Sequence, residues 1–224
     1  MLASYAARKP ATPEGPMDLE KNSPIAARLC LDAHARLMDH VALLDDTAAH
    51  QDSKLPGWSV GHVLTHLARN ADAHARRLDG ALRGVDVPKY ANGPGQRRQE
   101  IADGAQRSVS EIVHDLETSV AQLDEILQQS DDAGWPNSDF MGGSHYGAGA
   151  CPAHRLREVH MHMVDLGLGY TSSQWPDEYV RWDLENLLAT VPERLNGAGA
   201  RRELVAWLAG RGTLSQDFAL DPWG

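Results

Sequence analysis

Apolar residues recur at the spacing of an α-helix in four long stretches of this 224-residue chain. A period near 3.6 residues places such side chains on one helix face, which has to be buried against other helices. Between residue 170 and the C-terminus there is no run of alternating apolar and polar residues, so no strand is predicted there. The pattern predicts an all-α fold built on four main helices.

Capping residues and glycines set the expected bounds of the helices. Ser23 before Pro24 is a helix-start signal, with Ser23 as the capping residue, and Ser108 with Glu111 matches a capping box. The main helices are expected at residues 24–45, 60–82, 108–129 and 152–167. Shorter helices are expected at residues 96–103, 176–195 with a bend at Pro192, and 199–209. A long glycine-rich loop is expected over residues 135–151.

The chain is expected to have three parts. Residues 1–22 are rich in proline and glycine and are predicted to be a flexible leader, without the charge order of a signal peptide. Residues 23–170 hold the four main helices, and residues 171–224 form a short, mainly helical C-terminal segment. The tryptophans and leucines of this last segment can close the bundle or form a homodimer face, and core packing is the preferred interpretation.

Charge and cysteine content narrow the class of function. The 31 acidic residues outnumber the 21 basic ones, and a formal net charge of −10 disfavours binding to nucleic acid or to an anionic membrane. Cys30 and Cys151 are the two cysteines, which is too few for a disulfide framework. No apolar run reaches the roughly 20 residues of a membrane span. A cytoplasmic protein with small-molecule partners is expected.

Two of the expected helices carry a pair of metal-ligand side chains at positions i and i+4. The pairs are His62 with His66 and Glu158 with His162. Residues four apart lie one above the other on a helix, so each pair can converge on one point. Histidine nitrogen and carboxylate oxygen are common zinc ligands, and three protein ligands leave a position for water or substrate. Spacing alone does not decide which histidine of the first pair binds.

Chance is the competing explanation of these pairs. The chain has 11 histidines, so some pairs at helical spacing are expected without any metal. An unpaired polar side chain is costly to bury, however, and both pairs lie beside apolar residues of core-facing helices. From the residues alone, a metal site and a coincidence are about equally supported.

At these two helices the chain resembles the mycothiol-dependent maleylpyruvate isomerase family, a branch of the DinB-like metal-binding four-helix bundles. The matching stretches are Gly57 to Ala71 with its GWS and HxxxH residues, Arg97 to Gly104, Arg155 to Leu166 with its REV and VDL residues, and Leu208 to Gly212. The resemblance implies a DinB-like four-helix bundle with a short helical extension. It also implies a divalent metal, normally Zn²⁺, and a low-molecular-weight thiol such as mycothiol or glutathione.

Carried over by position, the family's metal ligands fall on His66, Glu158 and His162. His62 then becomes a packing residue or a neighbour of the ligands. Asp165 matches a family aspartate that orients a ligand histidine or caps the helix. Arg211, in a Gly-Arg-Gly turn, falls on the family's active-site arginine, which suits a carboxylate substrate.

Two departures from the family pattern bear on function. About forty residues separate Asp165 from Arg211, where family members usually carry a C-terminal α/β domain that helps shape the pocket. This leaves the substrate and the placement of Arg211 open. His160 stands where the family often has tryptophan.

The resemblance implies an enzyme that uses metal and thiol to isomerise a cis-unsaturated diacid such as maleylpyruvate, with neither cysteine taking part. A thiol S-transferase acting on an electrophilic substrate is the close alternative. A non-catalytic metal-binding bundle is the third, and it predicts that a fourth protein ligand, for example His62 or His160, closes the site.

Overall fold

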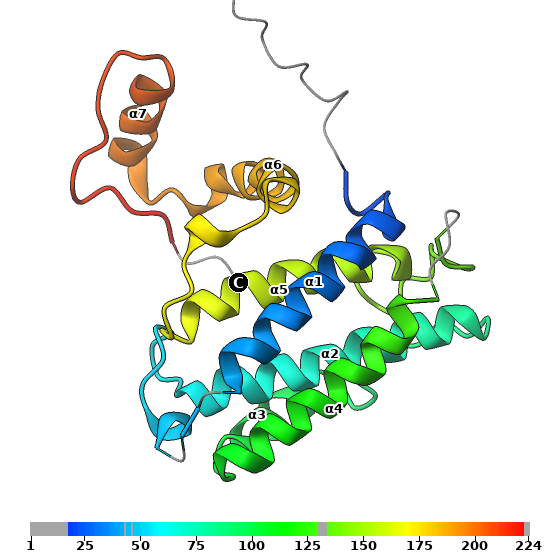
Figure 1. Cartoon of the computed structure of the whole chain (residues 1–224). Coiled ribbons are helices and arrows are strands. Elements are labelled where there is room, and N and C mark those ends of the chain that lie inside the picture. Colours follow the sequence, from blue (N-terminus) through cyan, green and yellow to red (C-terminus); the bar gives the residue numbers. More distant parts are fainter. Residues whose placement is uncertain (1–17, 43, 46, 130–133, 222–224) are drawn as a thin grey trace, which may run out of the picture.

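The computed structural model describes residues 18–42, 44–45, 47–129 and 134–221. Four helices form the bundle in Figure 1: α1 (Ser23–Val41), α2 (Val60–Leu82), α4 (Val109–Leu127) and α5 (Cys151–Asp165). The others are α3 (Pro94–Gly104), α6 (Asp177–Arg194) and α7 (Gly197–Leu208), with 3-10 turns η1 (Ala48–His50), η2 (Ala148–Ala150) and η3 (Ser172–Gln174). The described part of the chain contains no strand, only one isolated bridge between Asp52 and Ser59, which confirms the all-α prediction.

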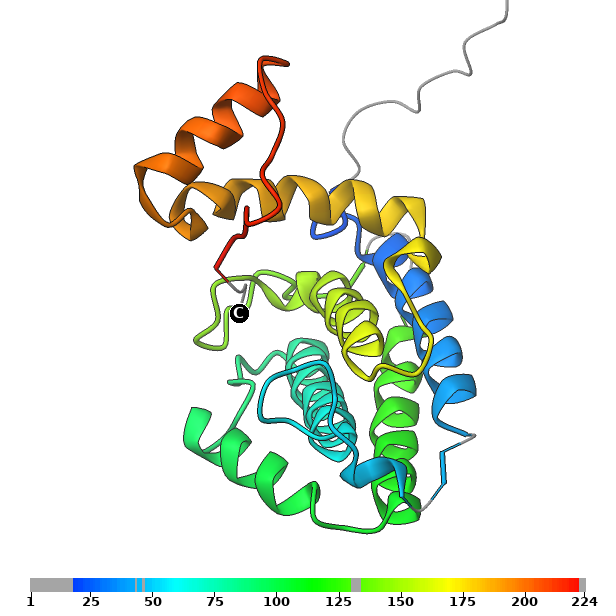
Figure 2. The same ribbon diagram turned by 90° about the vertical axis from the view of Figure 1, so that its left-hand side faces the viewer.

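Helix α2 is the central element of the bundle. It packs against α3, α4 and α5, while α1 packs against α4 and α5. Its face toward the core is fully buried at Val63, Leu64, Leu67, Ala68 and Ala71. Because α2 is covered on several sides, a polar side chain on it is removed from water and needs a partner. Figure 2 shows α2 enclosed between α3, α4 and α5.

Local capping explains why the helices begin where they do. The Ser59 hydroxyl accepts a hydrogen bond from the His62 backbone N–H at 3.3 Å and caps α2. At α4, Ser108 and Glu111 form the reciprocal capping box that the sequence predicts. Each cap satisfies backbone N–H groups that lack a partner within the helix.

The cap expected for the first helix was wrong by one residue. Asn22, rather than Ser23, accepts the hydrogen bond from Ile25 N–H. The Ser23 hydroxyl instead donates to the Gly149 carbonyl at 2.8 Å and fastens α1 to the turn before α5. Helix α1 also ends at Val41, short of the expected residue 45. Most of the predicted leader, residues 1–17, lies outside the described residues.

The long glycine-rich loop before α5 is held in place by polar contacts. Arg77 of α2 donates to the carbonyls of Phe140, Met141 and Tyr146. Gly142 N–H donates to Asp86 at 2.7 Å, which joins this loop to the one after α2. Gly142 has a φ of +51°, and a Cβ there would lie 2.2 Å from the Val87 carbonyl oxygen, so glycine is required. The loop before α5 and the loop after α2 therefore pack against each other.

The C-terminal helices differ in how they meet the bundle. Helix α6 packs on α5 through buried Tyr179 and Trp182, and Asp183 pairs with Arg157. This part of the core-packing expectation is confirmed. Helix α7 lies farther from the bundle in both views, and Trp207 is 48% exposed.

Among the described helices, none combines the length and the apolar character that crossing a membrane requires.

Candidate metal centre

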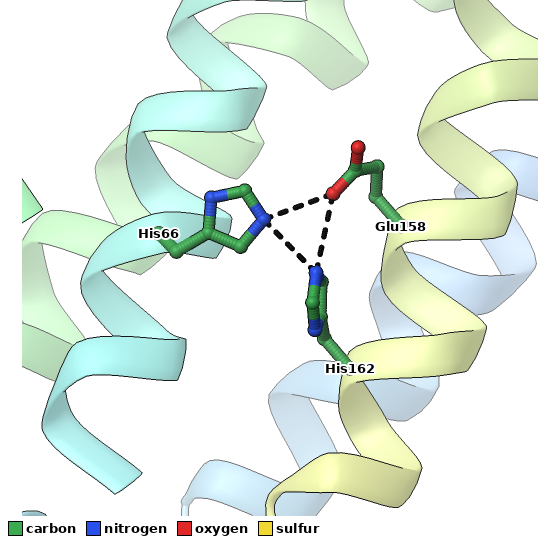
Figure 3. A group of neighbouring side chains, drawn as sticks. All are labelled: His66, Glu158 and His162. Carbon is green, nitrogen blue, oxygen red and sulfur yellow. Dashed lines mark hydrogen bonds and ion pairs between the residues drawn. The ribbon is translucent and has the colours of Figure 1, made fainter. Parts of the chain in front are cut away.

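Three side chains from two helices meet at one point in the core of the bundle. His66 projects from α2 toward Glu158 and His162 on α5, as Figure 3 shows. His66 Nε2 lies 2.9 Å from Glu158 Oε2 and 3.0 Å from His162 Nε2. His162 Nε2 lies 3.3 Å from Glu158 Oε2. The sequence placed two of these residues one helical turn apart, and packing of α2 on α5 supplies the third.

The donor set and its spacing fit a divalent metal. Two imidazole nitrogens and a carboxylate oxygen are a zinc-type ligand set, and all three ligand atoms lie within 4.8 Å of one another. Ligand atoms about 2.1 Å from a tetrahedral ion lie about 3.4 Å from each other. The separations in the structure are a few tenths of an ångström shorter than that. Small shifts of the three ligand side chains would therefore open the space that an ion occupies.

The site is buried on one side and reached from the other. The His66 side chain is 2% exposed, whereas those of Glu158 and His162 are 30% and 19% exposed. Access is therefore along α5 rather than through α2. Trp58 covers His66, with the two ring centroids 5.7 Å apart in an edge-on arrangement.

Asp165 orients His162. Its Oδ2 lies 2.9 Å from His162 Nδ1, so Nδ1–H donates to the carboxylate and Nε2 faces the group. A carboxylate on the second ring nitrogen is the usual partner of a metal-binding histidine. Burial alone would lower the pKa of His162, but hydrogen bonds to Asp165 and Glu158 outweigh it and raise the pKa to about 9. Both nitrogens of His162 are thus directed by carboxylates.

His66 has a different partner on its second nitrogen. Arg97 Nη2, from α3, lies 3.0 Å from His66 Nδ1. Because a guanidinium only donates, Nδ1 accepts, and Nε2 carries the proton that is donated to Glu158. Burial is the main reason that the pKa of His66 falls to about 4, and Glu158 only partly opposes it. His66 is therefore neutral in this arrangement.

Glu158 is ionised between the two histidines. Burial would raise its pKa, but the hydrogen bonds from His162 and His66 hold it well below the usual range of a carboxyl. The group therefore presents a carboxylate, a neutral imidazole on His66 and, on His162, an imidazolium that has to lose a proton before it can bind a cation. This is the protonation pattern from which a divalent ion displaces protons.

Arg155 fixes the two helices relative to each other. Its Nη1 donates to the Leu67 carbonyl at 2.8 Å and to Asn70 Oδ1 at 2.9 Å, and its Nε donates to His34 Nε2 at 2.9 Å. His34 Nδ1 in turn lies 2.5 Å from Asp124 Oδ1, so α1, α2, α4 and α5 share one buried network. Arg155 is fully buried. It sets the register that brings His66 opposite Glu158.

The remaining candidates lie outside the group. His62 Nδ1 faces Ser59 at the start of α2, 2.8 Å from its hydroxyl, and His160 Nδ1 is 2.8 Å from the Tyr170 hydroxyl. Neither belongs to the three-residue group, so the expected fourth ligand of the non-catalytic hypothesis is not found among the described residues. Arg211 is exposed and contacts the carbonyls of Ala209 and Gly210 in its own turn. Its predicted role stays a prediction.

Both cysteines are buried, and neither is part of a disulfide. Burial raises the pKa of the Cys30 thiol to about 12 and that of Cys151 to about 11. Neither thiol is a thiolate at neutral pH.

Several polar residues near the group carry no role in the sequence-based hypothesis. Arg97 belongs to a matched stretch, but nothing in its spacing shows that it contacts His66. His74 and His154 continue the two ligand series, at eight residues after His66 and four before Glu158. This spacing was the sequence signal that could have placed both histidines near the group, because positions i+4 and i+8 lie close to the same helix face.

Comparisons with known proteins give one family. The mycothiol maleylpyruvate isomerase N-terminal domain family matches residues 30–167, which include all three side chains of the group. A crystal structure of a histidine-to-alanine mutant of the mycothiol-dependent maleylpyruvate isomerase aligns with a TM-score of 0.70 and 24% sequence identity over 78% of this chain and 73% of that one. A second crystal structure of the mycothiol-dependent maleylpyruvate isomerase aligns with a TM-score of 0.66 and 26% identity over 71% and 67% of the chains. No curated protein sequence matches.

Proposed function

Because the chain belongs to the mycothiol maleylpyruvate isomerase N-terminal domain family, we propose that it is a metal-dependent enzyme that isomerises an unsaturated diacid with the help of a small thiol. Maleylpyruvate is the proposed type of substrate, Zn²⁺ or another divalent ion the proposed metal, and mycothiol or glutathione the proposed thiol. The single observation that carries this proposal is the convergence of His66, Glu158 and His162.

The residues of the group have distinct proposed roles. His66, Glu158 and His162 hold the metal, and Asp165 keeps His162 in the tautomer that turns Nε2 toward it. When bound, the metal supplies Lewis acidity that makes a coordinated thiol a thiolate at neutral pH. Trp58 shields the α2 side of the group from water.

In the proposed reaction, the double bond of the diacid becomes a single bond when the thiol adds. Rotation about this bond and loss of the thiol then give the trans isomer, so that the thiol is regenerated. The protein has to hold the carboxylates while the bond rotates. Arg211 is the arginine that the family resemblance proposes for this, although it lies in an exposed turn after α7.

A thiol S-transferase is the second proposed function, and one observation favours it. The arginine of the Gly-Arg-Gly turn does not reach the group, since the Arg211 side chain hydrogen-bonds only to carbonyls of its own turn among the described residues. A transferase needs the metal and the thiol but not a clamp for two carboxylates. The reaction would end at the adduct of the thiol with an electrophile.

Activity assays on zinc-loaded protein test these proposals. The protein is incubated with maleylpyruvate or with monochlorobimane, each in the presence of mycothiol, glutathione or bacillithiol. Isomerisation supports the first proposal, and bimane conjugation alone supports the second. His66→Ala should abolish activity, and His114→Ala, which changes an exposed histidine of α4, is the matched control. Absence of turnover with every pair of substrates would refute both.

A further inference from the structure

A second cluster of polar side chains lies in the bundle beside the metal group. It is centred on Tyr146, in the loop before α5, and comprises Lys89, His74, His154 and Arg77. The Tyr146 ring stacks on His154 with centroids 3.5 Å apart, and lies 6.4 Å from the His74 ring. Lys89 Nζ and Arg77 Cζ each lie 4.8 Å from the centroid of the same ring. The cluster thus joins α2, α5, the loop after α2 and the loop before α5.

The cluster is next to the metal group by helix geometry. His154 is one turn before Glu158 on α5, and His74 is two turns after His66 on α2. The two helices that supply the metal group therefore also supply this cluster. Burial lowers the pKa of Lys89, and Glu158 is the charge that most strongly opposes that lowering. Lys89 therefore lies within the electrostatic field of the metal group.

Three polar atoms of this cluster lack partners. Both ring nitrogens of His74 and the hydroxyl of Tyr146 are buried and make no hydrogen bond with the described residues. His74 is fully buried and Tyr146 is 5% exposed. Buried polar atoms are nearly always hydrogen-bonded, so unpaired ones gathered in one place indicate a ligand or ordered water.

The charges favour an anion over water. Lys89 makes no ion pair or hydrogen bond within the described part of the chain, whereas Arg77 donates to three backbone carbonyls through Nη2. An ammonium that is partly withdrawn from water and has no counter-ion is unfavourable, and water does not neutralise it. One free ammonium matches the single charge of a carboxylate.

Lys89 can be reached from outside. It lines a cavity of about 580 Å³ between the two loops, whose other walls include Tyr90, Ser144 and His145. Three glycines, Gly93, Gly142 and Gly143, form part of its surface and leave it open to a small ligand. Lys89 is the member of the cluster that lines this cavity, and Tyr146 follows His145 of its wall in the chain.

We propose that Lys89, the hydroxyl of Tyr146 and a ring nitrogen of His74 form a carboxylate-binding pocket beside the metal group. Lys89 supplies the charge, and Tyr146 and His74 supply neutral donors. This inference rests on the proposed function, since it assigns the anchoring of a carboxylate of the reacting molecules to Lys89. The carboxylate can belong to the diacid substrate or to a thiol that carries one, such as glutathione.

Binding experiments on the zinc-loaded full chain test the pocket. Fumarate and S-methylglutathione are titrated separately by calorimetry, because one represents the diacid and the other the thiol without a reactive sulfur. At least one should bind to the wild type. Lys89→Gln should weaken that binding roughly tenfold or more, and Tyr146→Phe by a smaller factor, because a hydrogen bond to a charged group is lost. Lys89→Arg should restore part of it.

Controls separate the pocket from the fold and from the metal group. Lys21→Gln changes a lysine whose side chain is 86% exposed and should bind as the wild type does. Zinc content and circular dichroism should be unchanged in all variants. The inference is overturned if neither probe binds, or if Lys89→Gln keeps its zinc and binds with unchanged affinity. If Lys89→Gln does not fold, Tyr146→Phe takes its place, and retained zinc with unchanged probe affinity in that variant overturns the inference.

Failure of the pocket and failure of the proposed function give different results. If the wild type shows no turnover but binds a probe through Lys89, the pocket stands and the proposed reaction falls. If the wild type turns over and Lys89→Gln is equally active and binds equally well, the reaction stands and the pocket falls.

Discussion

Arg97 Nη2 lies 3.0 Å from Nδ1 of His66, so a guanidinium occupies the place where a metal-binding histidine usually meets a carboxylate or carbonyl. A neutral histidine can bind metal through Nε2 only when its proton is on Nδ1. Arg97 cannot accept a hydrogen bond from that Nδ1–H, because a guanidinium only donates. The contact therefore favours the metal-free arrangement of His66. Binding of metal has to displace Arg97 from this nitrogen.

Replacement of Arg97 by an uncharged residue of similar length should tighten metal binding. For Arg97→Met we expect roughly tenfold higher zinc affinity, because changes in the partners of ligand residues alter affinity by about 10- to 100-fold. Competition with a chromophoric chelator measures it. Arg98→Met removes an exposed neighbouring charge and serves as the control. Equal or weaker binding in Arg97→Met would show that the guanidinium does not compete with the metal.

Asp165→Asn should have the opposite effect. The amide is a weaker acceptor for the Nδ1–H of His162, so the ring loses its orientation and some of its basicity. We expect zinc affinity to fall about tenfold or more. Asp39→Asn, at an exposed position of α1, should leave it unchanged. A normal zinc affinity in Asp165→Asn would mean that the contact serves only to end the helix.

The metal-free protein should lose stability as the pH rises above neutrality because of His162. The pKa of this histidine is raised to about 9 in the folded state, from about 6.5 in an unfolded chain. The contribution of His162 to the free energy of unfolding is fully present below about pH 6.5 and is lost as the pH passes about 9. Integrated over this interval it amounts to at most about 3 kcal/mol. Urea unfolding of metal-free protein at pH 6 and pH 9 measures the loss.

His162→Gln is the comparison for that measurement. It lacks the titrating group, so its free energy of unfolding should fall less between the same two pH values. The pKa of His66 is lowered to about 4, which reduces stability below about pH 6.5, but both proteins contain His66 and its effect cancels in the comparison. A parallel pH dependence of the two proteins would assign the loss to another group.

Arg155→Met should destabilise the bundle strongly. It removes the hydrogen bonds to Leu67, Asn70 and His34 and leaves buried acceptors without donors. Breaking a buried charged network of this kind costs about 3–5 kcal/mol. Chemical denaturation measures the change, and Arg181→Met, at an exposed position of α6, is the control. Unchanged stability would show that α5 keeps its register without Arg155.

The helices were predictable because their signals are local. Periodic apolar residues placed α2 and α4 to within a few residues, and Ser108 with Glu111 marked the start of α4. The cap of α1 was misplaced because Ser23 and Asn22 are both good capping residues. Which of them caps depends on the distant Gly149 carbonyl, which takes the Ser23 hydroxyl.

The metal group was only partly predictable from the residues. His62 and His66 lie on similar faces of one helix, and the difference between them is that the His62 ring turns back to Ser59. Spacing does not contain that information, and the family resemblance was needed to select His66. Arg155 was unpredictable for another reason, since a charged residue is normally at the surface and its burial depends on partners from two other helices.

The separation of the ligands along the chain has a consequence for folding. His66 is 92 residues from Glu158 and 96 from His162, so a chain in which α2 and α5 have not paired has no three-ligand site. An ion that binds the group then acts as a ligand of the native state alone and raises the free energy of unfolding with its concentration. Removal of the ion would therefore make the folded chain unfold more readily, whatever its effect on any reaction.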